Sequence, residues 1–170
     1  MNVIRNYCLN AVIAILAVAL VVPAVAADKK KVTGTNKDGQ VLSQSSASPG
    51  DDPNHSITQI VGAQRTTSNN ADWNNTQLIF YEHDDFVGGT GPQRGYATHT
   101  HANGDKSYFN YEGTAKMMAK DGGDWEQTWD GRFTWTGGTG KFKTLKGGGT
   151  YKCKFAPAGG QCDWQGDAEY

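Results

Sequence analysis

The chain has 170 residues, with 16 basic and 17 acidic side chains and a formal net charge of −1. This balance leaves no basic stripe of the kind that binds nucleic acid, so we expect no nucleic-acid partner. The length suits a single domain. The 22 glycines are about twice the average share of ~7% and indicate a protein with many tight turns.

The first 26 residues have the features of a secretory signal peptide. Arg5 supplies the positive charge, residues 11–22 form an apolar run, and residues 24–26 form a small-residue cleavage site. The apolar run is shorter than the ~20 residues of a membrane-spanning helix. The basic residues Lys29–Lys31 follow the cleavage site, so an uncleaved signal anchor is the alternative. We expect an exported protein, periplasmic or secreted, without membrane attachment after cleavage.

Residues 27–56 are polar and rich in turn-forming residues. Such a segment buries little apolar surface to offset the entropy lost on ordering. We expect a flexible arm or a long first loop there, with one weak strand near residues 40–42. The folded domain is then expected at residues 57–170.

From residue 57 onward, alternating runs are separated by glycine-rich and Asn-Gly turns, and none has a helical period. Regular turn signals are typical of a sandwich or a barrel, and closure removes exposed strand edges. The prediction is an all-β, closed eight-stranded antiparallel barrel. Its expected elements are strands at 57–61, 77–83, 95–102, 106–118 and 128–136, a short strand at 141–145 between two glycine turns, and a final hairpin.

Two cysteines remain after cleavage of the leader, Cys153 and Cys162. An even pair in an exported protein indicates a disulfide. Tyr151, Cys153 and Phe155 share one face of a strand, and Cys162 and Trp164 share a face of the next, so the bond would join the two strands. A redox-active pair would have the two-residue spacing that is missing here.

Three histidines are the candidates for a metal site. His99 and His101 share one face of an expected strand, and His83 ends another strand. Imidazoles bind zinc or copper, but a metal needs three or four convergent ligands. We favour the alternative that His99 and His101 belong to a polar, solvated hairpin face, and we expect no metal and no other cofactor.

An eight-stranded barrel has an interior that holds side chains or one small ligand. A carboxylate beside a tyrosine in that interior could act as a general acid. The favoured alternatives are that Asp84 and Asp85 cap a turn and that Glu112 pairs across strands. No catalytic residue is assigned, and the candidates for the cavity wall are Tyr81, Tyr96, Tyr108, Glu112, Trp129, Phe133 and Trp135.

Several segments between Trp73 and Tyr170 resemble a known superfamily. They are residues 104–113, 135–142, 147–151 and 166–170. In these segments the chain is similar to a bacterial member of the allene oxide cyclase-like barrels, a group that includes the plant dirigent proteins. The resemblance implies a barrel with an apolar cavity, often in a trimer. In the plant members the cavity steers cyclisation or radical coupling by its shape.

Three functions follow as hypotheses. The first is binding of a small apolar or aromatic molecule without turnover. The second is an isomerase or cyclase that acts through cavity shape and one acidic group. The third is a structural or surface protein. A binder predicts a cavity with few ionisable groups, an enzyme predicts a cavity with a desolvated carboxylate or tyrosine, and a structural protein predicts a solid barrel.

Overall fold

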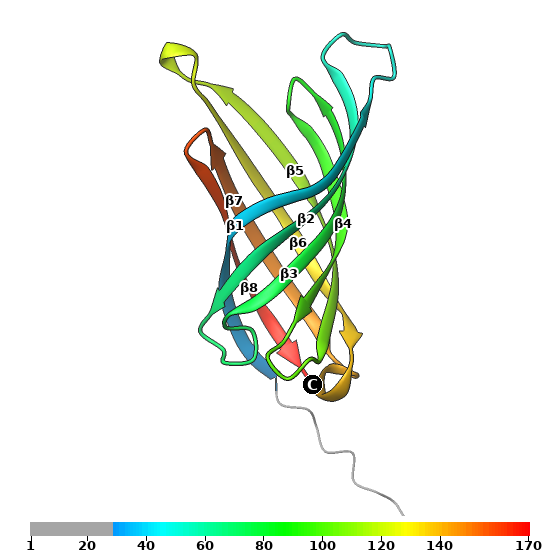
Figure 1. Cartoon of the computed structure of the whole chain (residues 1–170), viewed down its shortest axis with the longest axis vertical. Coiled ribbons are helices and arrows are strands. Elements are labelled where there is room, and N and C mark those ends of the chain that lie inside the picture. The colour runs from blue at the N-terminus through cyan, green and yellow to red at the C-terminus, as the bar shows by residue number, and fades with distance from the viewer. Residues whose placement is uncertain (1–28) are drawn as a thin grey trace, which may run out of the picture.

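The computed structural model describes residues 29–170 and shows one closed antiparallel barrel (Figure 1). Each strand pairs with the next, and β1 pairs with β8, which confirms the expected fold class. The strands are β1 (Lys29–Ala47), β2 (His55–Ser68), β3 (Thr76–Val87), β4 (Gly91–Thr100), β5 (Lys106–Ala119), β6 (Trp125–Gly138), β7 (Lys146–Ala156) and β8 (Gly159–Glu169).

Two 3-10 turns complete the elements, η1 (Asp121–Gly123) and η2 (Gly140–Phe142). The expected signal peptide, residues 1–26, lies outside the described residues. Within residues 29–170, no helix has the length and apolar character needed to cross a bilayer.

The expectation of a flexible arm or long loop at residues 27–56 is wrong, because the first strand of the barrel begins at Lys29. Residues 29–47 form β1, which pairs with β8 over Lys29–Asn36 and with β2 over most of its length. The strand needs few apolar residues because only its first part, Lys29–Asn36, pairs with β8 and closes the barrel. Val32 and Asn36 are the buried residues of this part. Backbone pairing, rather than apolar burial, orders the rest of this strand.

The expected short strand at residues 141–145 is also corrected. This segment contains η2 and a turn, in which the amide of Leu145 donates to the carbonyl of Phe142. Phe142 and Leu145 are buried at the end of the barrel where the C-terminus lies (Figure 1). The two apolar side chains therefore close this end instead of extending the sheet.

Aromatic side chains fill this end of the barrel. Trp73, in the loop between β2 and β3, is fully buried, with its ring centroid 5.2 Å from that of Trp135 and 5.4 Å from that of Phe142. Tyr170 meets the Trp73 ring edge-on at 5.5 Å. We call this buried cluster the aromatic plug; its residues are Val32, Trp73, Phe133, Trp135, Phe142, Leu145, Trp164 and Ala168.

Glycines on the inner wall make room for these large rings. A Cβ at Gly34 would overlap the indole of Trp164, and a Cβ at Gly62 would overlap the ring of Phe80. A side chain at either glycine would force the ring away from the wall. In its observed position, the Trp164 indole Nε1 donates to Asn36 Oδ1 over 3.2 Å.

The predicted disulfide is confirmed. Cys153 and Cys162 lie directly opposite each other in the register of β7 and β8, and their sulfur atoms are bonded. The faces predicted for Tyr151 and Trp164 are correct, since both residues lie on the cavity side with the cysteines.

Replacing Gly34 by alanine tests the packing of rings on glycines. We expect Gly34→Ala to lower the free energy of unfolding by about 1–3 kcal/mol, because the new methyl group collides with Trp164 and with the backbone oxygen of Thr67. Gly39→Ala on the same strand is the matched control, since its Cβ would lie 3.5 Å from Gln64, an ordinary contact. Urea unfolding measures both, and equal losses would contradict the packing argument.

Candidate functional site

A cavity of about 1050 Å³ lies inside the barrel next to the aromatic plug. Phe133, Trp135 and Trp164 belong to both the plug and the cavity wall, so the plug forms the cavity floor. The remaining wall is mostly apolar and aromatic. It includes Ile60, Leu78, Phe80, Ala97, Phe109, Tyr111, Trp129, Tyr151 and Phe155.

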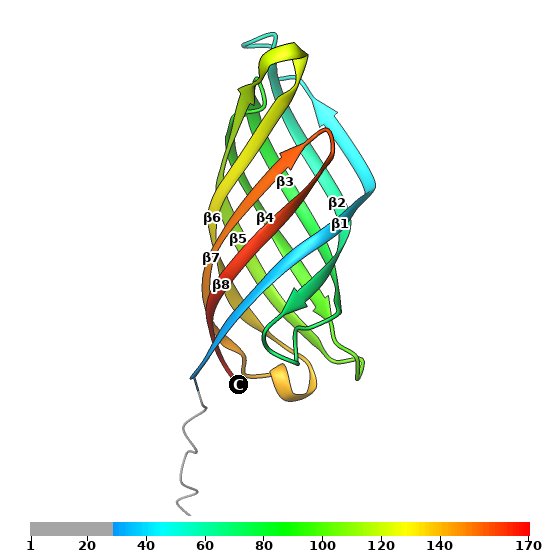
Figure 2. The same ribbon diagram turned by 90° about the vertical axis from the view of Figure 1, so that its left-hand side faces the viewer.

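The cavity opens sideways between β1 and the β7–β8 hairpin. Pairing of β1 with β8 ends at Asn36 and Cys162, whereas β1 continues to Ala47 with only β2 beside it (Figure 2). The cavity wall contains residues 37–41 on one side of this separation and residues 158–160 on the other. Val41, at the rim, is 57% exposed. A molecule could therefore enter between the two elements.

Two carboxylates lie on the inner side of β3. Glu82 and Asp84 are 7% and 3% exposed, on the same face of the strand as Leu78. Glu82 lines the cavity, and its Oε2 accepts a hydrogen bond of 3.0 Å from the hydroxyl of Tyr111. Gly95 lies between Glu82 and Tyr111 in the register, and its missing side chain lets the tyrosine ring cross β4.

A second tyrosine crosses the wall in the same way. Asp84, Gln93, Gly113, Gly131 and Tyr151 follow one another in the register from β3 to β7. A Cβ at either glycine would overlap the Tyr151 hydroxyl region. Because both glycines are bare, the hydroxyl reaches Gln93 and accepts a hydrogen bond from its Nε2. We call Glu82, Asp84, Gln93, Tyr111 and Tyr151 the polar layer.

Some polar atoms in the polar layer have no partner. Asp84 Oδ1 and Gln93 Oε1 are buried and accept no hydrogen bond, and Trp129 in the cavity wall has an unpaired indole N–H. Buried polar groups without partners are costly and uncommon in folded proteins. Neither Asp84 nor Gln93 lines the cavity, whereas Glu82 does, so Glu82 is the carboxylate of the polar layer that a ligand in the cavity can reach.

Burial shifts the protonation of the polar layer. Desolvation, followed by the neighbouring charge of Asp84, raises the pKa of Glu82 to about 8, although the hydrogen bond from Tyr111 acts in the opposite direction. Desolvation raises the pKa of Asp84 to about 7. Desolvation also raises the pKa of Tyr111 and Tyr151 above the usual tyrosine value. Near neutral pH the two carboxyl groups are therefore partly protonated.

The expectation of a solvated face for His99 and His101 is wrong. Both rings point inward and are 1% and 6% exposed. His99 Nδ1 is 3.0 Å from the hydroxyl of Thr76, and desolvation lowers the pKa of His99 to about 3. His101 Nδ1 is 2.6 Å from the carbonyl of Asp72, to which it donates, and its Nε2 is 2.9 Å from Ser107 Oγ.

These hydrogen bonds fix both rings beside the plug, where His99 also forms part of the cavity wall. His83 follows Glu82 on β3, so strand alternation places it on the opposite, outer face. The three histidines therefore do not converge. Among residues 29–170, no group of three or more His, Cys, Asp or Glu side chains is arranged to hold a metal ion.

Four of the candidates for the cavity wall lie outside the barrel. Tyr81 and Tyr96 are paired across β3 and β4 and are 54% and 69% exposed. Tyr108 precedes the inward Phe109, and Glu112 forms an exposed ion pair with Arg132. Trp129, Phe133 and Trp135 line the cavity.

The sequence analysis missed Glu82 as a site residue. Leu78 and Phe80 are apolar and precede it at two-residue steps, which places all three on one face of the strand. The signal was therefore present: the sequence predicts a strand at residues 77–83, but the inner face of that strand was not used to select Glu82.

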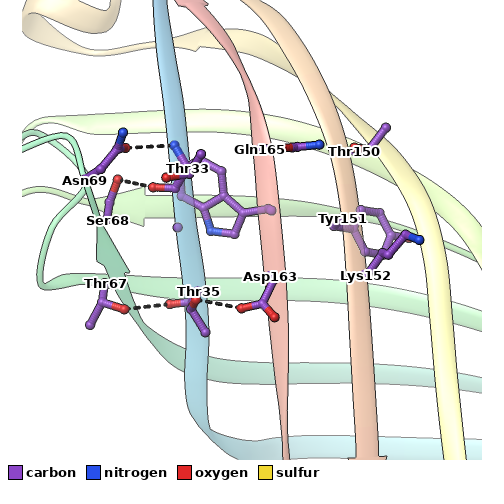
Figure 3. A pocket seen from close by; sticks show the side chains of 12 residues that line it. Thr33, Thr35, Thr67, Ser68, Asn69, Thr150, Tyr151, Lys152, Asp163 and Gln165 are labelled. Atoms are coloured by element: carbon purple, nitrogen blue, oxygen red, sulfur yellow. Dashed lines mark hydrogen bonds between the residues drawn. The ribbon is translucent and has the colours of Figure 1, made fainter.

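A second pocket, of about 590 Å³, lies on the outer surface over β1, β7 and β8 (Figure 3). Some of its polar groups are paired with one another. Thr35 Oγ1 donates to Asp163 Oδ1 over 2.7 Å, and Asn69 Oδ1 accepts from the Thr33 amide over 2.8 Å. This pocket is smaller than the barrel cavity and lies on the outer surface, so it is the weaker candidate.

No protein-family model, curated protein or solved structure matches this chain.

Substitution of Glu82 tests the burial of the polar layer. A folded-state pKa raised to about 8 means that the folded protein holds a proton that the unfolded chain has lost, so Glu82 reduces stability as pH rises from about 4.5 to 8. Glu82→Gln removes this loss and should raise the free energy of unfolding at pH 9 by on the order of 2 kcal/mol, with little change at pH 4.

Urea unfolding at both pH values measures this effect. Glu112→Gln, at an exposed carboxylate on the outer face, is the control and should change stability by less than about 0.5 kcal/mol at either pH. A Glu82→Gln protein with the pH dependence of the parent would show that Glu82 is solvated.

Proposed function

We propose that the barrel binds one small, largely apolar or aromatic molecule in its cavity. The hollow of about 1050 Å³ beside a buried aromatic floor is the observation that carries this proposal. Ligand pockets are commonly clefts or cavities of ~300–1000 Å³ with mainly apolar walls and a few polar groups. Glu82, Tyr111 and Tyr151 of the polar layer provide polar groups in the cavity wall, and the side opening provides an entry path.

The structure gives less support to a purely structural role. A structural barrel would be filled throughout, whereas the aromatic plug occupies one end and leaves the cavity beside it. The resemblance to allene oxide cyclase-like barrels agrees with a cavity that holds an apolar molecule. As part of the same proposal, the protein belongs to that superfamily, assembles as a trimer and is exported from the cytoplasm.

A second candidate function is proton transfer to or from the bound molecule, as in an isomerase or cyclase. The observation that favours it is the desolvated Glu82 in the cavity wall, hydrogen-bonded by Tyr111. A carboxyl group with a pKa of about 8 can hold or release a proton near neutral pH, as general acid–base catalysis requires. Both functions require that the small molecule binds in the cavity.

Binding is tested with the neutral aromatic probe N-phenyl-1-naphthylamine, whose fluorescence rises in apolar surroundings. We expect saturable one-to-one binding to the parent protein. Ala97 lines the cavity between Phe80 and Phe109 in the register, so Ala97→Trp fills part of the hollow and should weaken binding by at least about tenfold, or about 1.4 kcal/mol.

Thr98→Trp is the matched control, because the next residue on β4 faces outward and its substitution should leave binding unchanged. Circular dichroism verifies that both variants fold, and Ala97→Leu provides a milder filling variant. Equal probe affinity in the parent, Ala97→Trp and Ala97→Leu proteins would show that the probe does not occupy the cavity.

A further inference from the structure

The polar layer identifies the kind of polar group that the ligand carries. We propose that the cavity selects a cationic amphiphile, whose protonated amine lies at Glu82 in the cavity wall and whose apolar or aromatic body lies against the rest of that wall. Asp84, two residues further along the inner face of β3, adds a second negative charge close to this position. This inference rests on the proposed binding function and adds a specific head group to it.

Glu82 is the acceptor that the polar layer presents to the cavity. It lines the wall, and its Oε2 accepts one hydrogen bond, from the hydroxyl of Tyr111. Asp84 Oδ1 and Gln93 Oε1 also lack a donor, but these two residues lie outside the cavity lining. An ammonium group offers three N–H donors and no acceptor, so it matches a buried carboxylate better than a hydroxyl, which has one donor.

The charges of the cavity wall also favour a cation. The cavity wall contains Glu82 but, apart from the buried His99, its one basic residue is Lys37, which is exposed at the rim on β1. None of the ion pairs found in residues 29–170 involves Glu82 or Asp84. A cation bound in the cavity would pair with Glu82, a buried carboxylate that lacks a counter-charge.

Other occupants of the polar layer fit less well. An anionic head group would be repelled by both carboxylates. The unpaired indole N–H of Trp129 could donate one hydrogen bond to such a group, which does not offset this repulsion. A metal ion would need a third protein ligand of a kind that is not grouped with Glu82 and Asp84 in residues 29–170. An organic cation needs no such ligand set.

The surrounding rings also favour an organic cation. Trp129 lies in a cluster with Phe86 and Phe155, with ring centroids 6.4 and 4.9 Å from that of Trp129. Trp129 and Phe155 line the cavity with Tyr111 and Tyr151. Aromatic faces attract ammonium groups and also accommodate the apolar body of the ligand, so one wall serves both parts of an amphiphile.

The proposal predicts a rise in amine affinity with pH. The titratable groups around Glu82 are Asp84 on the same strand, Tyr111 on β5 and Tyr151 on β7, while Gln93 on β4 does not titrate. At pH 6 the two carboxyl groups are mainly neutral, and above pH 8 they are mainly ionised. An alkylamine remains protonated over this range, so the charge pair strengthens as pH rises.

The test uses three ligands with the same apolar body: phenylhexylamine, phenylhexanol and phenylhexanoate. Isothermal titration calorimetry at pH 6 and pH 8.5 measures their affinities for the full chain. We expect the amine to bind at least about tenfold more tightly than the alcohol at pH 8.5, with a smaller preference at pH 6. The alcohol should show no pH dependence, and the acid should bind weakest.

Glu82→Gln and Asp84→Asn should each reduce the amine preference by about tenfold while leaving alcohol binding within about twofold. Glu112→Gln, which removes a carboxylate from the outer face, should behave as the parent.

The outcomes separate the two proposals. If the alcohol binds in the cavity but the amine shows no preference, the head-group assignment is wrong and the proposed binding function stands. If the acid binds best, the assignment is likewise overturned. If none of the three ligands binds, both proposals fail.

Discussion

The architecture of this barrel depends on large aromatic rings that lie flat across glycines of the neighbouring strands. Gly95 lets Tyr111 reach Glu82, and Gly113 and Gly131 let Tyr151 reach Gln93. Two tyrosines from β5 and β7 thereby join four strands around one polar layer. A methyl group at any of these glycines would push a hydroxyl away from its partner. The glycine pattern thus determines both the shape of the inner wall and the chemistry at its centre.

The barrel interior is divided along its axis into regions of different character. The aromatic plug packs one end so closely that even His99 and His101 are buried there, each hydrogen-bonded to neighbouring residues. Beyond the plug floor the wall encloses a hollow that opens where β1 separates from β8. The polar layer contains buried carboxylates that reduce stability at neutral pH, because the folded state raises their pKa. A stability cost beside a cavity is typical of a functional site.

The sequence predicts the all-β barrel and the disulfide well, because turn glycines, strand alternation and an isolated cysteine pair are local signals. It fails for β1, whose order comes from pairing with the neighbouring strand β2 and with β8 at the far end of the chain. It also fails for Tyr81, Tyr96 and Glu112, which are chemically suited to a site but have the wrong strand parity for the interior. Glu82 could have been found from its parity with Leu78 and Phe80. The unpaired acceptors of Asp84 and Gln93 are visible only once four strands are brought together.

The central claim, a barrel with one packed end and one hollow, ligand-binding region, is tested most directly by fluorine NMR of protein labelled with 5-fluorotryptophan. The five tryptophans sample both regions, since Trp125, Trp129, Trp135 and Trp164 line the cavity, whereas Trp73 is buried in the plug and is not part of the cavity wall. On addition of N-phenyl-1-naphthylamine, the account predicts that the Trp129 resonance shifts with saturation while the Trp73 resonance stays in place. A shift of Trp73 without one of Trp129, or no shift at all, would contradict it.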